Sequence, residues 1–397
     1  MQVPAKTFEQ ARACIIAETT RIATAATSET VELLNAADRV LAIDILADRD
    51  YPATARSVRD GFALRAQDLP GTLTVIGEVR AGERWAGTVN TGQALEIMTG
   101  APMPAGADAV VMIEHVIRTS DAIQVDRTLQ VGENFNPQGR EATAGSIVLH
   151  KGRRLTFTDI AQLATVGKSH VDVHRKPTVA ILATGDELIG IDEIPQDFQV
   201  RNSNSQALAI QVRRAGGQPQ ILEVARDLYD HTRTLVELGL QSDLLLLSGG
   251  VSAGKYDIVE KVLADLGAEF FFDRVRIQPG QPLVFGKARG KLFFGLPGNP
   301  ASTMVTFEVF ARAAVEVLSG IPDPKLPIAW ATLTREFRHK PGLRRFLPAV
   351  VEDGAVTPVS WAGSGDVSAL SRANAFLIAD PDKGEYRQGD WIQVLFQ

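Results

Sequence analysis

Cysteine is almost absent from this sequence, since Cys14 is the only one among the 397 residues. No disulfide can form within the chain, and a zinc or iron–sulfur site built from several cysteines is impossible. Long apolar runs are also missing, because no uncharged stretch approaches the roughly 20 residues that span a bilayer. Residues 1–18 lack the basic start and apolar core of a signal peptide. We therefore expect a cytoplasmic protein with no membrane partner.

A surplus of basic residues is missing as well. The chain has 41 Lys and Arg against 47 Asp and Glu, a formal net charge of −6 at pH 7. Proteins that bind nucleic acid usually carry a basic surplus, so we expect no nucleic-acid partner. A net negative charge does not exclude the binding of small anionic ligands, because such binding depends on the few residues around the ligand. The length predicts roughly two to four domains.

The first part of the chain mixes helical and β-type patterns. Apolar residues at helical spacing predict helices over 8–25 and 156–166. Between them, over 51–126, short β-type runs alternate with Gly and Pro turns, as in a small all-β unit.

Strand and helix patterns alternate from Pro177 onward, which predicts a parallel, doubly wound sheet. Prolines at 322, 324 and 327 mark a boundary, and the short runs of 328–397 predict a small β-barrel or sandwich. The strands and helices predicted in the alternating region lie at 178–183, 204–215, 219–225, 244–247, 291–295 and 302–318.

The most informative segment is 243–257, where an apolar run ends in a glycine-rich loop before a helical pattern. Unpaired backbone N–H groups at such a junction bind anions. Gly249, Gly254 and Lys255 approach the nucleotide-binding P-loop pattern, but Tyr256 stands where that pattern needs Ser or Thr to bind magnesium. The loop therefore predicts a phosphate or oxyanion cradle rather than an ordinary ATPase site.

Acidic residues follow the predicted strands: Asp186 and Glu187 the first, Asp227 the second and Asp257 the third. The carboxyl ends of parallel strands meet at one edge, where ligands bind. Carboxylates beside a phosphate cradle repel an anion unless a cation intervenes, and oxygen ligands suit Mg²⁺. The alternative is that individual acids cap helices or face solvent. Four such residues at one edge favour the magnesium site.

His170, Asp172 and His174 alternate with valines, so one strand face would carry two imidazoles and a carboxylate. That arrangement resembles a metal site. We favour a solvent-facing strand surface over a valine-packed inner face, because polar residues at period two are ordinary on half-buried strands.

Short segments, spread in order over nearly the whole chain, resemble the molybdopterin molybdenumtransferase family, which includes bacterial MoeA and the E domain of gephyrin. Each segment alone is modest evidence for the family, but the set of segments in this order is highly specific to it. The segments are Ser57–Ala63, Ile97–Pro102, Gly106–Glu114, Thr184–Leu188, Asn202–Asn204, Ser248–Ser252 and Leu296–Pro300.

The resemblance implies an enzyme of molybdenum cofactor biosynthesis. It would insert molybdate into adenylylated molybdopterin and release AMP, aided by Mg²⁺. The implied partners are a second copy of the chain in an elongated homodimer, a molybdopterin adenylyltransferase as substrate donor, and molybdoenzymes or their chaperones as acceptors. The active site is expected between the α/β domain of one protomer and the second domain of the other.

The implied fold is a multidomain α/β protein. A doubly wound parallel α/β domain of the molybdopterin-binding type is flanked by an N-terminal α+β region with a β-rich insert and by a small C-terminal β-barrel. The expected domains are I (1–45 plus 135–175), II (46–134), III (176–323) and IV (324–397).

The resemblance also implies site residues. Glu187, Asp227 and Asp257 are the expected metal ligands, and Glu141 stands where the family often has aspartate. The residues expected in catalysis are Asp60, Thr99, Glu141, Glu187, Asp227 and Asp257. Those expected to bind the cofactor are Thr184, Gly185, Asp186, Ser248, Gly249, Gly250, Ser252, Gly254, Pro297, Gly298, Asn299, Arg344, Arg345 and Ser364.

The chain departs from the family pattern at the expected molybdate pocket. Many relatives have Lys-Pro-Gly-Lys where this chain has Gln278-Pro-Gly-Gln281. An arginine common in the last domain is also displaced, and Arg276, Arg344 and Arg345 are the candidates to replace the missing charge. Molybdate and tungstate both stay open as the oxyanion. Two alternative functions remain for this chain: a nucleotide pyrophosphatase of the CinA type and a non-catalytic scaffold like gephyrin.

Overall fold

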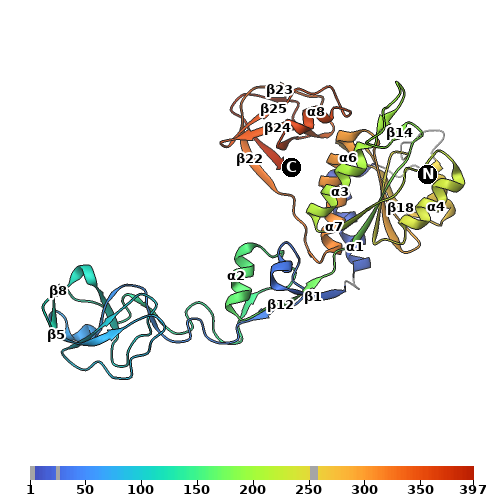
Figure 1. The fold of residues 1–397 in the computed structure, drawn as a ribbon. Helices are drawn as coiled ribbons and strands as arrows, with labels where there is room; N and C mark the ends of the chain where they lie inside the picture. The colour runs from blue at the N-terminus through green and yellow to red at the C-terminus, as the bar shows by residue number, and fades with distance from the viewer. Residues whose placement is uncertain (1–4, 24–26, 251–257) are drawn as a thin grey trace.

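The computed structural model describes residues 5–23, 27–250 and 258–397 and shows an elongated molecule (Figure 1). A six-stranded sheet, in the order β16-β13-β17-β21-β20-β18, forms the α/β unit. Its strands are β13 (Thr178–Ala183), β16 (Gln218–Ile221), β17 (Leu244–Ser248), β18 (Glu269–Arg274), β20 (Pro282–Ala288) and β21 (Lys291–Leu296).

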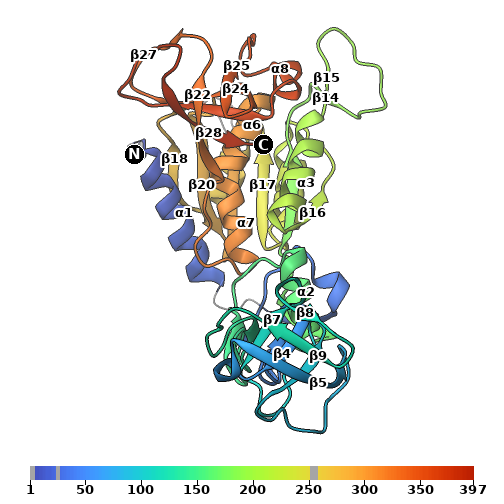
Figure 2. The ribbon, with the colours of Figure 1, turned by 90° about the vertical axis from the view of Figure 1, so that its left-hand side faces the viewer.

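Strand β17 shows why helices cover both faces of this sheet. Leu244 and Leu246 belong to the core under α1, α3, α6 and α7, whereas Leu245 and Leu247 belong to the core under α4 and α5. Successive side chains of a strand point to opposite faces, so a run of leucines needs two cores. Figure 2 shows the layers. The helices are α1 (Phe8–Ile22), α3 (Ser203–Ala215), α4 (Tyr229–Gly239), α5 (Ile258–Asp265), α6 (Pro300–Thr306) and α7 (Arg312–Leu318).

The sheet is mixed: the four strands predicted from the alternating pattern are parallel, as expected, and one further strand, β20, runs in the opposite direction. Strands β16, β13, β17 and β21 run parallel, but β20 pairs antiparallel with both β21 and β18. Only Arg289 and Gly290 separate β20 from β21, and their φ values are 50° and 77°. A two-residue turn with positive φ makes a hairpin, and a hairpin is necessarily antiparallel.

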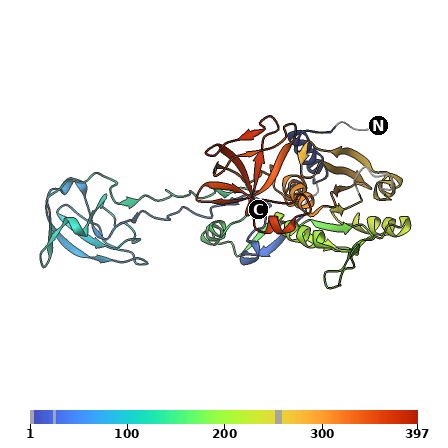
Figure 3. The same ribbon diagram turned by 90° about the horizontal axis from the view of Figure 1, so that it is seen from above.

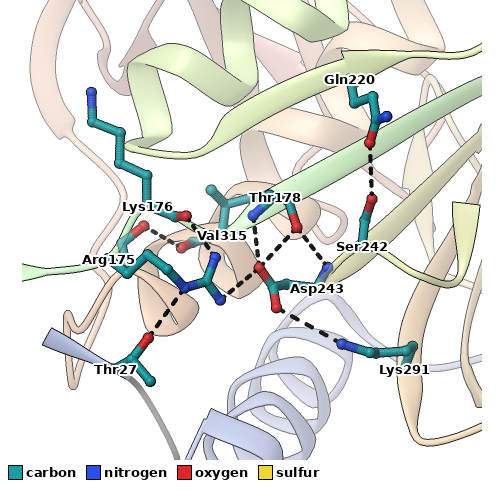
Figure 4. Close-up of polar contacts among 10 residues, drawn as sticks. Thr27, Arg175, Lys176, Thr178, Gln220, Ser242, Asp243, Lys291 and Val315 are labelled. Carbon is teal, nitrogen blue, oxygen red and sulfur yellow. Dashed lines mark hydrogen bonds and ion pairs between the residues drawn. The ribbon is translucent and has the colours of Figure 1, made fainter. Parts of the chain in front are cut away.

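Asp243 holds together the amino ends of the parallel strands (Figure 4). Its Oδ2 accepts from the backbone N and the hydroxyl of Thr178, at 2.7 and 3.0 Å, and from Arg175 at 3.0 Å. Lys291 of β21 lies 3.8 Å from its other oxygen. Burial opposes ionisation of Asp243, but these hydrogen bonds outweigh it and lower its pKa. Arg175 also donates to Thr27, which ties this corner to the N-terminal part of the chain.

The N-terminal α+β unit combines chain from both sides of the β-rich insert. Strand β1 (Ser28–Glu32) pairs with β12 (His170–His174), β2 (Ile45–Leu46) pairs with β11 (Ile147–Leu149), and α2 (Phe157–Thr165) packs beside them. Val171 and Val173 are buried, whereas Asp172 accepts from Thr30 across the strand pair. No group of three His, Cys, Asp or Glu side chains suited to a metal occurs in the described part of the chain. The burial of Val171 and Val173 confirms the valine-packed inner face of the strand.

The β-rich unit projects away from the rest of the chain on two connecting strands (Figure 3). Those strands, β3 (Arg56–Ser57) and β10 (Phe135–Asn136), pair with each other. Beyond them lies a six-stranded sheet with its own buried clusters. Its strands are β4 (Gly61–Leu64), β5 (Gly71–Val79), β6 (Gln93–Ile97), β7 (Ala109–Met112), β8 (Ile117–Arg118) and β9 (Ala122–Val125).

The C-terminal unit is a closed five-stranded barrel. The pairings β24–β25, β25–β22, β22–β28, β28–β26 and β26–β24 complete a circuit, so these strands leave no free edge. The strand pair β23 (Phe337–Arg338) and β27 (Glu385–Tyr386) and helix α8 (Val367–Ser371) complete the unit. The barrel strands are β22 (Ile328–Leu333), β24 (Arg344–Glu352), β25 (Ala355–Pro358), β26 (Ala375–Ala379) and β28 (Trp391–Phe396).

The helix predicted over 302–318 contains a π-helical segment, Phe307–Ala311, between α6 and α7. Arg12 of α1 donates to the carbonyl of Val309 in this segment at 2.6 Å. Glu308 and Glu316 are 5% and 6% exposed, and Arg312 pairs with them at 3.4 and 2.9 Å. No helix among the described residues is long and apolar enough to cross a membrane.

Arg312→Met should lower the free energy of unfolding by about 2 kcal/mol or more, because it leaves two buried carboxylates without their cation. Adding Glu308→Gln and Glu316→Gln should recover much of this loss. Arg233→Met is the matched control, since it breaks an exposed i,i+4 pair with Glu237 and should cost less than about 1 kcal/mol. Urea unfolding of the four proteins measures the differences, and equal losses for Arg312→Met and Arg233→Met would contradict the assignment.

Candidate active site

A cavity of about 810 Å³ lies at the carboxyl ends of the parallel strands, which is where open α/β sheets bind ligands. The turns after β13, β17 and β21 supply its floor, and the start of α3 supplies one wall. The barrel contributes Gly365. Of the residues predicted from the sequence, those that line the cavity are Thr184, Gly185, Glu187, Asp227, Ser248, Gly249, Gly250, Pro297, Gly298 and Asn299.

The glycines allow the turns to approach each other closely. A Cβ on Gly249 would lie 2.8 Å from the carbonyl oxygen of Thr184, and one on Gly250 would lie 2.6 Å from the Thr184 hydroxyl. Both glycines have positive φ, 89° and 62°, which side chains rarely adopt. The backbone N of Thr184 donates to the carbonyl oxygen of Ser248 at 3.0 Å, and the backbone N of Gly249 donates to the carbonyl oxygen of Leu296 at 3.3 Å. The backbone of three turns is thereby packed into one surface.

Three carboxylates gather at the end of this surface. The backbone N of Asp227 donates to Asp186 Oδ1 at 3.2 Å, and Glu187 folds over Gly185, where a Cβ would lie 2.4 Å from its Oε2. Partial burial, and then the negative charges of Asp186 and Glu187, raise the pKa of Asp227. Carboxylate oxygens are ligands that Mg²⁺ prefers, but these three side chains do not form a group arranged to hold a metal ion in the described part of the chain. Asp186 does not line the cavity, but its side chain accepts a hydrogen bond from the backbone N of Asp227, which does.

Asp257, Ser252 and Gly254 lie outside the described residues. The remaining two predicted metal ligands, Glu187 and Asp227, both line the cavity. Ser364 lies at the border between the barrel and the α/β unit, where its carbonyl accepts from the backbone N of Ala301 at 2.9 Å.

Three family models match the chain in succession. They are described as the MoeA N-terminal region (domain I and II), over residues 6–167, the probable molybdopterin binding domain, over 180–317, and the MoeA C-terminal region (domain IV), over 331–396. The molybdopterin molybdenumtransferase of Bacillus subtilis (strain 168) is 36% identical over 384 residues, which cover 93% of this chain and 89% of that protein. The chain belongs to the molybdopterin molybdenumtransferase family.

Other relatives agree with this family assignment. The molybdopterin molybdenumtransferase of Staphylococcus epidermidis (strain ATCC 12228 / FDA PCI 1200) is 34% identical over 368 residues, covering 90% of this chain and 88% of that protein. The crystal structure of the molybdopterin biosynthesis moeA protein from Pyrococcus horikoshii OT3 matches with a TM-score of 0.85 and 30% identity, over 99% of this chain and 100% of that one. The predicted family, fold class and transferase class are confirmed. The CinA-type alternative is set aside, because the family matches extend beyond the α/β unit.

The residues that the family resemblance places in the β-rich unit do not line the cavity. Asp60 accepts from the backbone N of Thr99 at 2.7 Å, and this hydrogen bond lowers the pKa of Asp60. Glu141 lines a separate cavity of about 440 Å³ in the N-terminal unit, with Tyr51 and Arg153. These three residues therefore lie apart from the strand ends of their own chain (Figure 1).

Arg344 and Arg345 begin β24 of the barrel, beside the turn that replaces the family lysines. Gln278 pairs with Arg345 across the parallel strands β19 (Ile277–Gln278) and β24, and the turn leads to Pro282 in the cavity wall. Neither arginine lines the cavity. Arg344 is bound to Glu9 at 2.6 Å, and its guanidinium lies over the ring of Phe8.

Sequence reasoning missed several lining residues. Asn202, Ser203 and Asn204 enter the cavity from the start of α3, and Leu188 and Val200 enter from the short pair β14 (Leu188–Ile189) and β15 (Val200–Arg201). The Asn-Ser-Asn segment was part of the family resemblance, but no role was assigned to it. The segment lies at the start of a helix and directly after a strand. This position is the signal in the sequence that could have assigned it to the ligand site.

Asp227→Asn should raise the melting temperature at pH 7 without divalent cations, because it removes a carboxylate repelled by Asp186 and Glu187. The gain should stay below about 1 kcal/mol, since the group reaches solvent. A raised pKa in the folded state means that wild-type stability falls as pH rises through that pKa, and the variant should lack this part of the decline. Mg²⁺ should stabilise the wild type more than the variant.

Asp353→Asn is the matched control, since it removes the same charge at a barrel turn where φ is 47° and asparagine is tolerated. Thermal unfolding across pH 4 to 8, with Mg²⁺ and with EDTA, measures the effect. If Asp227→Asn and Asp353→Asn respond alike to Mg²⁺, then Asp227 does not belong to a cation site.

Proposed function

We propose that this protein inserts molybdate into adenylylated molybdopterin, releases AMP and thereby forms the molybdenum cofactor, with a requirement for Mg²⁺. One observation carries the proposal: a glycine-turn cradle and two carboxylates, Glu187 and Asp227, share one cavity at the strand ends. This combination suits a phosphate-bearing ligand whose negative charge is matched by a cation. Family membership supplies the reaction class. The reaction and the division into domains I to IV are carried over from the family pattern.

The cavity residues divide into two roles in this proposal. The turns around Gly185, Gly249 and Gly298 hold the phosphate-bearing end of the pterin, because turns at the carboxyl ends of parallel strands are where phosphate groups bind. Glu187, Asp227 and Asp257 would hold the metal. When bound, Mg²⁺ neutralises negative charge on the phosphoryl groups of the substrate.

The oxyanion needs its own donors, and we place them at the turn of Gln278 and Gln281. Among the arginines near this turn, Arg344 is already paired with Glu9, and Arg276 donates to the carbonyl of Gly342 at 3.2 Å. Arg345 makes only a long contact from Nη2 to the carbonyl of Lys340, at 3.5 Å, and its buried Nε has no partner among the described residues. It is therefore the cation best placed to restore part of the charge of the missing lysines. Molybdate and tungstate are both tetrahedral dianions, and this donor set suits either.

We also propose a cytoplasmic homodimer whose second chain completes the active site. Asp60 and Thr99 lie in the β-rich unit, which projects away from the cavity of its own chain (Figure 3). A second copy can bring these residues to the cavity, as the family resemblance implies. A molybdopterin adenylyltransferase would supply the substrate, and molybdoenzymes or their chaperones would receive the product.

Incubation with adenylylated molybdopterin, Mg²⁺ and molybdate should release AMP and yield active cofactor, assayed by chromatography and by reconstitution of a molybdoenzyme. Asp227→Asn should reduce AMP release at least 100-fold, because a cation-binding carboxylate is lost, while molybdopterin still binds. Asp353→Asn should behave like the wild type. A wild-type protein that binds molybdopterin but releases no AMP would favour the scaffold alternative.

Mixing two inactive variants tests the shared site. Asp60→Asn and Asp227→Asn should each be inactive alone, but after subunit exchange the mixture should recover about a quarter of wild-type activity. Half of the dimers are then mixed, and one of the two sites in each mixed dimer is intact. A mixture of Glu187→Gln with Asp227→Asn should recover nothing, because both changes fall in the same α/β unit. Sedimentation of the wild type as a monomer at micromolar concentration would contradict the dimer.

A further inference from the structure

Asn204, the second residue of α3, lies between two of the turns that form the cavity. The preceding Asn202 caps the helix, since its side chain accepts from the backbone N of Ser205 at 3.2 Å. Asn204 is therefore not needed as a cap. It lines the cavity and is partly buried there.

The amide of Asn204 bridges residues far apart in the sequence. Its Nδ2 donates to the hydroxyl oxygen of Ser248 at 3.0 Å and to the carbonyl oxygen of Gly298 at 2.8 Å. A carbonyl can only accept, so the contact with Gly298 fixes which end of the amide faces the turns. Both hydrogens of the amide are used, one on the turn after β17 and one on the turn after β21.

This bridge determines what the Ser248 hydroxyl can do. A hydroxyl has one hydrogen to donate, and Ser248 accepts from Asn204 instead of donating to it. Ser248 is 2% exposed, and its hydroxyl hydrogen has no acceptor among the described residues. That hydrogen is left for a ligand in the cavity.

We propose that Asn204 is a positioning residue that presents the Ser248 O–H to the terminal phosphate of molybdopterin and locks the two turns at the spacing that receives it. This inference rests on the proposed function for the identity of the ligand. Asn204 acts through Ser248, because both of its donor hydrogens are committed to the turns, and its buried Oδ1, which has no partner among the described residues, can only accept and so cannot bind a phosphate oxygen directly.

The test is a double-mutant cycle on phosphate recognition. The dissociation constants of molybdopterin and of its dephosphorylated form are measured by equilibrium titration, without turnover. Their ratio isolates the contribution of the phosphate from other contacts of the side chain. The proteins are the wild type, Asn204→Ala, Ser248→Ala and the double variant, with Asn204→Leu as a second replacement that keeps the volume of the side chain.

Each single variant should reduce the phosphate preference at least about tenfold, which is the effect of one hydrogen bond to a charged group. The double variant should lose no more than the larger single loss, because both changes remove the same interaction. Gln211→Ala is the control. It removes contacts of the same helix to Met304 and Glu308, at 3.0 and 2.9 Å, outside the cavity. It should lower thermal stability and leave the preference unchanged.

Two results would overturn the inference. One is a preference unchanged in both Asn204 variants while Ser248→Ala lowers it, and the other is a double variant whose loss equals the product of the single losses. Equal affinity of the wild type for the two pterins would also overturn it, because the phosphate would then not be held here. Absence of AMP release from a wild type that prefers the phosphorylated pterin would contradict the proposed function alone.

Discussion

The alignment of β13 with β17 at their amino ends is the constraint on which the cavity depends. Asp243 accepts from both the backbone and the hydroxyl of Thr178, so neither strand can slip by one residue without losing these hydrogen bonds. A slip would also exchange the two sets of leucines of β17 between the two cores. Because the register is fixed at one end of each strand, Thr184 and Ser248 emerge together at the other end. The relative position of Thr184 and Ser248 at the carboxyl ends of the strands thus depends on the hydrogen bonds of Asp243 at the amino ends.

The cavity then combines two features that oppose each other electrostatically. A phosphate held at the glycine turns, as proposed, would be repelled by the carboxylates of Glu187 and Asp227, which line the same cavity. The raised pKa of Asp227 reflects this arrangement, since burial and the neighbouring carboxylates disfavour its charged form. A cation bound between the two parts removes the conflict, so anion and cation should bind cooperatively. At the proposed oxyanion end, by contrast, Gln278 and Gln281 are neutral, so in this proposal the positive charge has to come from an arginine.

Much of the α/β unit could be predicted from the sequence, because runs such as Leu244–Leu247 and turns such as Gly249-Gly250 encode local structure directly. The antiparallel direction of β20 could not be predicted, since a buried strand pattern is the same in parallel and antiparallel sheets. The cradle residues were also predicted. The role of Asn204 was not predicted, because it depends on a long-range contact: the carbonyl that Asn204 meets is 94 residues away in the chain. Asp60 and Thr99 were singled out through the family resemblance alone, and the position of their unit could not be read from local pattern.

The packing of α1 on the last helix of the α/β unit has a consequence during synthesis of the protein. Arg12 contacts the carbonyl of Val309, 297 residues later, and Ala11 and Ile15 share the core beneath α7. A ribosome needs about 15 to 60 s to add that length of chain. The apolar face of α1 therefore stays uncovered until the residues around Val309 have been synthesised. The β-rich unit, whose contacts are closer in sequence, can fold before that. The protein is thus expected to depend on protection of its N-terminal helix in the cell until the α/β unit is complete.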